Sequence, residues 1–398
     1  MTQPELPNLG LSGGKRRIKE LDGIRGIAIL LVMMTHFGGI NPSSNIESAW
    51  NHFANICWIG VDIFFVLSGF LITEILVETK GFANYLKAFY MRRVLRIFPL
   101  YYACVFTFFC IVVPIGKLIG RWPDIAWTEQ LWYWTYTSNI RTAYVDFVRP
   151  FQHFWSLALE EQFYLVWPFM VMKYSEKHLK WICIGGLLLS PLLRIVAVLY
   201  FPHAGGVDFV YRLTPFRIDS LLWGALACLM LKSNYIAAIP NQSPRLLIVG
   251  GAFITTFFAL VALGQNTHEY APLLSTVGYS LLGAASALLI LHAVLRSESK
   301  TIYCRVVRSP GLTKFGKYSY GLYVWHLPFS LYIPNIFRRM HVPELYVGLA
   351  SFLLGSIVTY LTALLSWRYL ETPFLRLKDR FGYGTGKFDN ATVAFTST

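Results

Sequence analysis

Two ionisable residues share one face of the first strongly apolar segment. Arg25 and His36 are 11 residues apart, which in an α-helix is ~1100° of rotation, about 20° from full alignment, and ~16 Å of rise. An imidazole titrates near neutral pH and therefore serves as a general base. A histidine within an apolar helix also commonly forms a hydrogen bond to a neighbouring helix. Both interpretations of His36 are open at this point.

Two adjacent carboxylates, Glu160 and Glu161, interrupt a later apolar segment. A carboxylate in such a segment needs a partner, because burying an unpaired charge is costly. Consecutive helical residues point ~100° apart, so at most one of the two readily faces His36. Glu160 either orients and charge-stabilises that imidazole, or forms a structural ion pair with Arg194 or Arg217.

A basic segment and a second histidine complete the set of candidates. Segment 82–97 is amphipathic, and Arg93 and Arg96 within it lie on one helical face. His326 lies in another apolar segment and is followed by Pro328, which disturbs a helix. The cysteines form no CxxC pair and no zinc-type spacing occurs, so no metal site is expected.

The elements that must position these residues are membrane-spanning helices. The chain has 398 residues, of which 55% are apolar and 14% charged, and its mean hydropathy is +0.48. Soluble chains typically carry about 25% charged residues. Continuous apolar runs of about 20 residues, enough to cross a ~30 Å hydrocarbon layer, recur along the sequence. We therefore expect an all-α polytopic integral membrane protein.

About ten transmembrane helices are expected, together with one amphipathic interfacial helix. Segment 82–97 is the expected interfacial helix, because its basic face suits the membrane surface. The expected spans are 24–40, 58–77, 98–118, 153–172, 181–200, 215–231, 246–264, 272–295, 316–335 and 344–367.

The distribution of lysine and arginine predicts the orientation of these spans. With the boundaries above, 25 of the 35 Lys and Arg residues fall on one side and 7 on the other. Cytoplasmic loops are enriched in Lys and Arg, so both termini are expected in the cytoplasm. This bias accounts for the net charge of +14, and no nucleic-acid partner is expected. Arg25, Arg194 and Arg217 fall within spans, where an arginine usually faces a polar cavity.

The chain divides into three expected regions. Residues 1–19 form a basic cytoplasmic N-terminal tail, and residues 20–375 form the transmembrane domain. Residues 376–398 are polar and rich in glycine, and they are expected to form a disordered cytoplasmic tail.

Seven motifs occur in an order that resembles membrane acyltransferase family 3, which includes the O-antigen and exopolysaccharide O-acetylases. The resemblance covers roughly residues 20–375. The motifs are LDGIRGIA with the Arg25–His36 spacing, GVDIFFVLSGFLIT, RRVLRIFPLY, FWSLALEEQFY, FRIDSLLWG, YSYGLYVWHLP and RYLETP.

The resemblance implies transfer of an acyl group, commonly acetyl, from cytoplasmic acyl-CoA to a hydroxyl of a glycan, a lipid-linked saccharide or another acceptor. Acyl-CoA is then a donor substrate, and no cofactor is permanently bound. The implied location is the bacterial cytoplasmic (inner) membrane. Many family members carry an additional hydrolase-like domain, whereas this sequence ends soon after its last expected span. We therefore expect a single-component acyltransferase.

The resemblance also implies roles for the candidate residues. His36 is the expected base toward the acceptor hydroxyl, or alternatively a covalent acyl relay. His326 either handles the acceptor or acyl group or only packs. Four arginines are expected to bind the phosphates of acyl-CoA, because guanidinium groups bind phosphate bidentately; otherwise they are topology signals or lipid anchors. They are Arg25, Arg92, Arg93 and Arg96.

A secondary transporter or flippase for a lipid-linked glycan is the alternative function. Such carriers also have many spans with ionisable residues inside the membrane. The sequence shows no inverted internal repeat, and its basic segment accompanies a histidine-bearing first span. Both features favour the acyltransferase.

Overall fold

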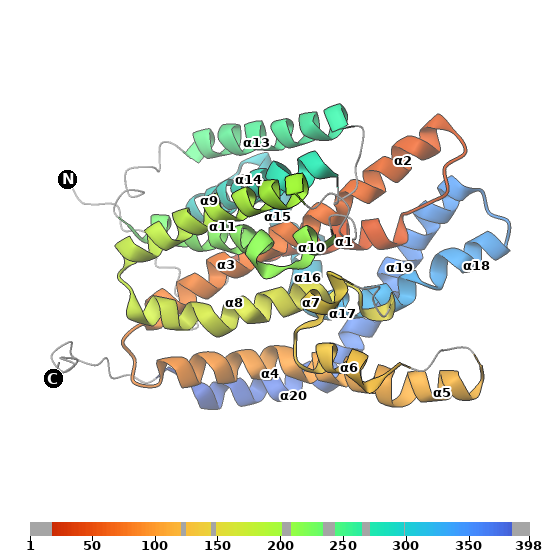
Figure 1. Ribbon diagram of the computed structural model, residues 1–398, viewed down its shortest axis with the longest axis horizontal. Helices are drawn as coiled ribbons and strands as arrows, with labels where there is room; N and C mark the ends of the chain where they lie inside the picture. The colour runs from red at the N-terminus through yellow and green to blue at the C-terminus, as the bar shows by residue number, and fades with distance from the viewer. Residues whose placement is uncertain are drawn as a thin grey trace.

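The computed structural model describes residues 18–120, 125–144, 149–200, 208–233, 243–264, 271–297 and 299–383. Over these residues the chain is helical, with short 3₁₀ and π turns and without β-strands (Figure 1). The expected N-terminal tail lies outside the described residues except for residues 18 and 19. The expected C-terminal tail lies outside them from residue 384 onward.

Long helices form the body of the protein and shorter helices connect them. The longer helices are α1 (Lys19–Phe37), α2 (Asn45–Ile56), α3 (Gly60–Thr79), α4 (Tyr85–Phe106), α8 (Phe154–Lys173), α9 (Glu176–Tyr200), α11 (Thr214–Lys232), α13 (Ser243–Gly264), α14 (Tyr279–Leu295), α17 (Ser319–Ser330) and α19 (Glu344–Ser366). The shorter ones are α5 (Val113–Leu118), α6 (Trp127–Trp134), α7 (Ser138–Thr142), α10 (Asp208–Arg212), α15 (Ile302–Val307), α16 (Pro310–Lys317), α18 (Ile333–Arg339) and α20 (Thr372–Leu377).

Each of the ten expected spans overlaps helical structure, although 98–118 begins within α4 and 316–335 covers parts of α16, α17 and α18. Seven helical stretches within the described residues are long and apolar enough to cross a membrane by length and composition. The helices α1, α8 and α17 are not among these seven. These three helices carry His36, Glu160 and His326.

The expected separate interfacial helix over 82–97 is wrong. Residues 85–97 are the first turns of α4, which continues through a π turn at Thr107–Val112 into α5 as one stretch of 34 residues. Arg93 and Arg96 on the polar face of this segment line two cavities, and Arg96 is also exposed.

Small residues bring α3 and α11 into close contact. A Cβ atom added to Gly69 would lie 1.9 Å from the carbonyl oxygen of Leu221. A Cβ atom on Gly224 would likewise lie 1.9 Å from the carbonyl oxygen of Val66. Such small-residue contacts are a common way for membrane helices to associate, because the backbones approach closely.

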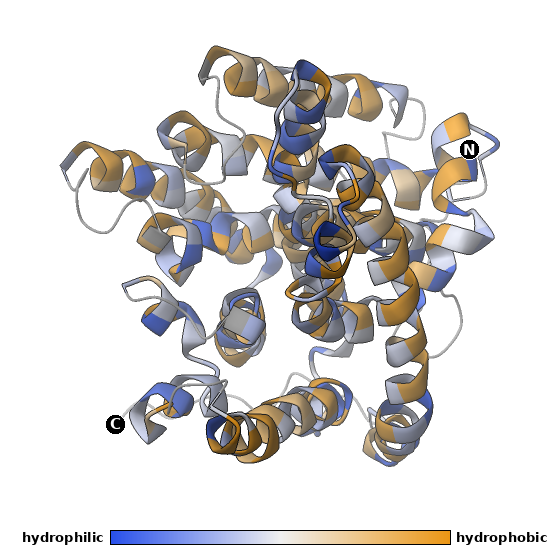
Figure 2. Ribbon diagram, turned by 90° about the vertical axis from the view of Figure 1, so that its right-hand side faces the viewer, coloured by the Kyte–Doolittle hydropathy of each residue, from blue (hydrophilic) through white to orange (hydrophobic). Residues whose placement is uncertain are grey.

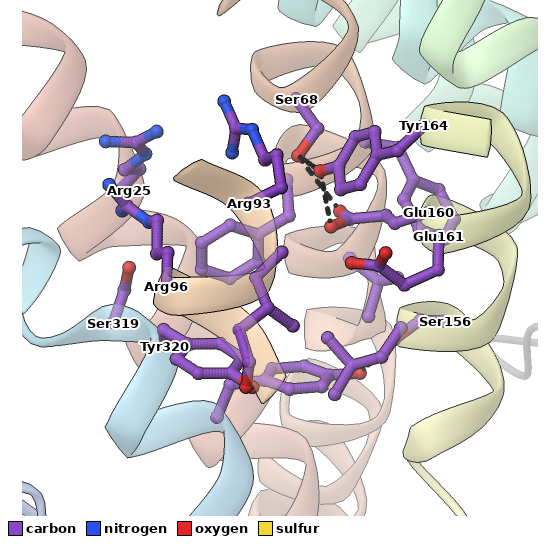
Figure 3. A pocket seen from close by; sticks show the side chains of 16 residues that line it. Arg25, Ser68, Arg93, Arg96, Ser156, Glu160, Glu161, Tyr164, Ser319 and Tyr320 are labelled. Atoms are coloured by element: carbon purple, nitrogen blue, oxygen red, sulfur yellow. Dashed lines mark hydrogen bonds between the residues drawn. The ribbon is translucent and has the colours of Figure 1, made fainter. Parts of the chain in front are cut away.

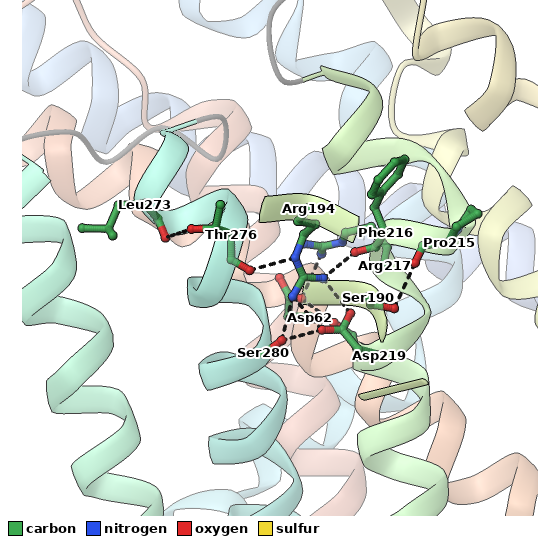
Figure 4. A network of polar contacts seen from close by, with 11 residues as sticks. Asp62, Ser190, Arg194, Pro215, Phe216, Arg217, Asp219, Leu273, Thr276 and Ser280 are labelled. Atoms are coloured by element: carbon green, nitrogen blue, oxygen red, sulfur yellow. Dashed lines mark hydrogen bonds and ion pairs between the residues drawn. The ribbon is translucent and has the colours of Figure 1, made fainter. Parts of the chain in front are cut away.

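One fully buried ion pair joins these two helices to each other, and a second joins α11 to α9 (Figure 4). Arg217 on α11 binds Asp62 on α3 at 2.9 Å. Arg194 on α9 binds both carboxylate oxygens of Asp219 on α11, at 3.0 and 2.9 Å. Ser280 on α14 donates to the same Asp219 at 2.6 Å. Two of the three arginines expected within spans, Arg194 and Arg217, therefore form structural ion pairs.

Apolar side chains cover the outer helices (Figure 2). Leu188 and Leu199 on α9, and Ile248 and Leu263 on α13, are each 69–78% exposed. Leucine and isoleucine that are exposed at this density suit contact with lipid rather than with water.

Candidate active site

A polar cavity lies where α1, α3, α4, α8 and α17 meet (Figure 3). Arg25, Arg93 and Arg96 line one part of it, and Glu160 and Glu161 line another. The arginines come from α1 and α4, whereas both glutamates come from α8. The cavity thus holds guanidinium and carboxyl groups within a helical bundle, which is typical of a site that binds a polar molecule.

Glu160 is held by hydrogen bonds inside this cavity. Its carboxylate accepts from the Ser68 hydroxyl at 3.1 Å and from the Tyr164 hydroxyl at 2.9 Å. The expected partners Arg194 and Arg217 pair elsewhere, with Asp219 and Asp62, so the ion-pair interpretation of Glu160 was wrong.

A second, strongly basic cavity adjoins the first. Arg25, Arg93 and Arg96 line both cavities, and Arg92 lines the second one only. All four arginines named from the sequence therefore converge, although α1 and α4 are far apart in the chain. Guanidinium groups grouped in this way favour a ligand with several anionic oxygens.

Three histidine rings form a continuous cluster on the other side of the polar cavity. The ring centroids of His36 and His326 are 4.9 Å apart, and those of His326 and His153 are also 4.9 Å apart. His153 and His326 are buried. His36 and His326 were both singled out from the sequence, and the structure brings them into edge-to-face contact.

Backbone contacts define the tautomer of two of these rings. Nδ1 of His36 lies 2.8 Å from the Val32 carbonyl oxygen, and Nδ1 of His326 lies 2.6 Å from that of Tyr323. A carbonyl only accepts, so each Nδ1 carries the proton and each neutral ring has its lone pair on Nε2. The imidazole of His36 is thus oriented by Val32, whereas the hydrogen bonds of Glu160 go to Ser68 and Tyr164.

Ser156 and Tyr323 connect the polar cavity to the histidine cluster. Both line the cavity, and their hydroxyl oxygens lie 2.5 Å apart. The Tyr323 hydroxyl also lies 3.1 Å from the His153 carbonyl oxygen. His36 is not among the residues that line either cavity. Tyr323 therefore contacts both the polar cavity and two rings of the histidine cluster, those of His153 and His326.

The comparison with known families agrees with this arrangement. The sequence profile of the acyltransferase 3 domain matches residues 18–368. The chain belongs to acyltransferase family 3. The match includes every candidate residue named from the sequence, from Arg25 on α1 to His326 on α17.

Individual members of acyltransferase family 3 are similar over the same region. Peptidoglycan O-acetyltransferase OatA of Listeria monocytogenes is 29% identical over 390 residues, covering 90% of this chain and 56% of the relative. O-acetyltransferase OatA of Staphylococcus aureus is 28% identical over 373 residues, covering 90% and 57%. YrhL of Bacillus subtilis, named as a candidate peptidoglycan O-acetyltransferase, is 30% identical over 374 residues, covering 90% and 55%.

This member of the family spans a little over half the length of those relatives. No solved structure matches the chain.

Sequence reasoning missed the residues that connect the cavity to the histidines. His153, Ser156 and Tyr323 were not singled out from the sequence. One signal was available, because His153 directly precedes the FWSLALEEQFY motif. On α8, Ser156 and Glu160 are four residues apart and so share a face.

Proposed function

We propose that this protein is an acyl-CoA-dependent O-acyltransferase of the bacterial cytoplasmic membrane. It moves an acetyl group from cytoplasmic acetyl-CoA to a hydroxyl of a glycan or glycan-like acceptor. One observation carries the proposal: a cavity lined by four arginines adjoins a polar cavity that leads to paired imidazoles. The names of the relatives support the acetyl group and the glycan class of acceptor.

The donor binds first by its phosphates. CoA carries a diphosphate and a 3′-phosphate, and Arg25, Arg92, Arg93 and Arg96 offer guanidinium groups in one cavity. The pantetheine arm then extends past Arg93 and Glu160 into the polar cavity. Its thioester points toward Ser156 and Tyr323, beside the histidine cluster.

His36 acts as the general base. Its Nε2 lone pair takes the proton from the acceptor hydroxyl while the hydroxyl oxygen attacks the thioester carbonyl carbon. The C–S bond breaks, and the departing thiolate takes the proton back from the imidazolium. Products are the O-acyl ester and CoA thiol, so no proton is gained or lost. His326, in edge contact with His36, positions that ring.

A measurement of thiol release tests this function. Purified protein in detergent is incubated with acetyl-CoA and with cell-wall glycan fragments, and free thiol and glycan-bound radiolabelled acetyl are both counted. We expect slow thiol release with water as acceptor, and stimulation by a suitable glycan. A glycan transporter or flippase would release no thiol. If His36 is instead a covalent relay, acid quenching before acceptor is added will trap label on the protein.

A further inference from the structure

The last described segment of the chain packs along α4 rather than leaving the protein. α20 and the following turn at Lys378–Phe381 lie beside α4 (Figure 1). Arg92 on α4 donates to the carbonyl oxygens of Lys378 and Phe381 at 3.2 and 3.3 Å. Asn84, just before α4, donates to the Gly382 carbonyl at 2.8 Å. Residues 376–383, expected to be part of a disordered tail, are thus held by side chains of α4 and its N-cap.

This segment contributes a fifth cation to the basic cavity. Lys378 lines the cavity together with the four arginines. Arg25 has an acidic neighbour, Asp22, at 3.7 Å. Within the described residues, no carboxylate lies within ion-pair distance of Lys378 or of the three arginines of α4; the adjacent Asp379 is exposed.

Such a cluster of cations repels itself unless an anion binds among them. Like charges in a partly buried cavity interact more strongly than in water, because the local dielectric constant is lower. A ligand with one phosphate would contact only part of this group of four arginines and Lys378. A ligand with several phosphate groups fits the cluster better.

An aromatic ring closes the same cavity. Tyr383 lines it, and the guanidinium carbon of Arg92 lies 5.8 Å from the centre of the Tyr383 ring. The Phe82 ring centre lies 6.3 Å from that of Tyr383 and steadies it. Aromatic rings beside cations are a common platform for a nucleobase, which stacks on the ring while its phosphates contact the charges.

We propose that Lys378 and Tyr383 form one wall of the site that binds the adenosine-phosphate part of acyl-CoA. Lys378 contacts a phosphate, and the Tyr383 ring stacks on the adenine. This inference rests on the proposed function, and it adds a recognition element from the opposite end of the chain to the arginines of α1 and α4.

The test measures binding rather than turnover. CoA and adenosine 3′,5′-bisphosphate are titrated by calorimetry into the full-length protein in detergent, for Lys378→Gln, Lys378→Arg and Tyr383→Ala. We expect Lys378→Gln to weaken both ligands ~10-fold, since a hydrogen bond to a charged group is lost. The Lys378→Arg variant should bind both ligands with an affinity within about threefold of that of the parent. Tyr383→Phe is titrated as well, and Tyr383→Ala should bind both ligands more weakly than Tyr383→Phe.

Arg380→Gln is the matched control. Arg380 is an exposed cation two residues along the same segment, and it does not line the cavity. It should bind CoA like the parent. If Lys378→Gln also binds like the parent while Arg96→Ala is weakened, the wall proposal is wrong and the proposed function stands. If the parent itself binds no CoA, the proposed function fails and the wall proposal falls with it.

Discussion

At the scale of single residues, a backbone hydrogen bond decides which ring nitrogen of His36 can act as a base. Its Nδ1 is occupied by the Val32 carbonyl, so its basic nitrogen is Nε2. This is the arrangement that a general base needs, because the ring cannot change tautomer without losing a hydrogen bond. The proposed role therefore predicts a loss of chemistry without a loss of fold.

We expect His36→Gln to lower acetyl transfer by ~100-fold or more, the usual scale for removal of a general base. Glutamine retains hydrogen bonding but has no basic nitrogen. CoA affinity and the thermal unfolding midpoint should stay close to those of the parent. Radiolabel transfer, calorimetry and thermal unfolding in detergent check the three quantities. A variant that keeps most of its activity would make His36 a structural hydrogen-bond partner.

Arg96 should act in binding. Arg96→Ala is expected to weaken CoA binding about 10- to 100-fold, the equivalent of ~1.5–3 kcal/mol for a charge-assisted contact. Arg96→Lys should recover part of the affinity, because it restores the charge without the bidentate fork. Arg339→Ala, which removes an exposed arginine distant from the cavities in sequence, serves as the control. Equal affinities for all three variants would leave Arg96 as a topology signal.

The sequence predicted the members of the site better than their contacts. Residue type and helical spacing identified Arg25, His36 and His326, because ionisable groups in apolar segments are few. The hydrogen bond from Ser68 to Glu160 joins α3 to α8, and side-chain geometry between helices is not encoded in the spacing of one helix. His153 was missed for the same reason, since its role follows from the ring of His326 beside it.

At the scale of helices, hydrophobic periodicity located the elements, but it did not reveal what their polar faces contact. The basic face of segment 82–97 was expected at the membrane surface. In the structure the same face points into the protein, where the cavities accept its arginines. Because this face does not lie along the membrane surface, the helix does not need to end at residue 97, and α4 continues past Pro99.

The contact between α3 and α11 should be intolerant of a single methyl group. We expect Gly69→Ala to destabilise the protein by about 1–3 kcal/mol or more, because its Cβ would overlap the Leu221 carbonyl oxygen. Gly251→Ala on α13 is the control, since nothing lies within 4 Å of its Cβ position. That change should be neutral or stabilise by ~0.5–1 kcal/mol. Thermal unfolding in detergent distinguishes the two, and equal midpoints would contradict the close approach.

Removing one partner of the buried Arg194–Asp219 ion pair should destabilise the protein more than removing both partners. Arg194→Met leaves Asp219 without its charged partner, which typically destabilises by ~3–5 kcal/mol. Arg194→Met combined with Asp219→Leu removes both charges and should recover much of that loss. Unfolding midpoints of the parent, the single variant and the double variant give the comparison. A double variant less stable than the single one would mean that Asp219 is stabilised without Arg194.

At the scale of the whole molecule, the two ends of the described chain meet at one cavity. Arg25, near the start of α1, and Lys378, after α20, line it together. Ends that meet on one face are what an even number of membrane crossings requires. The lysine and arginine count predicts that this face lies in the cytoplasm, which is the side that the proposed acyl-CoA donor requires.

A reporter fusion tests this orientation. Alkaline phosphatase needs an oxidising compartment, so a fusion after residue 398 should be expressed but inactive. A fusion in the loop before α2, after residue 41, should be active and serves as the positive control. High activity at residue 398 would place the arginine cavity on the side without acyl-CoA, and the proposed donor would then be excluded.

Three helices lack the length or composition of a membrane span, and this affects how the protein is inserted into the membrane. α1, α8 and α17 are less suited than their neighbours to enter the bilayer alone, yet a ribosome delivers helices one at a time. Ser68 and Arg93 contact α8 and are synthesised before it. When α8 inserts, Ser68 can therefore donate to Glu160, and Arg93 can pack on the Tyr164 ring. α17 packs on α19, which is synthesised after it. Insertion of α17 should therefore stay incomplete until α19 emerges, and a chain that ends between them should be cleared by membrane proteases.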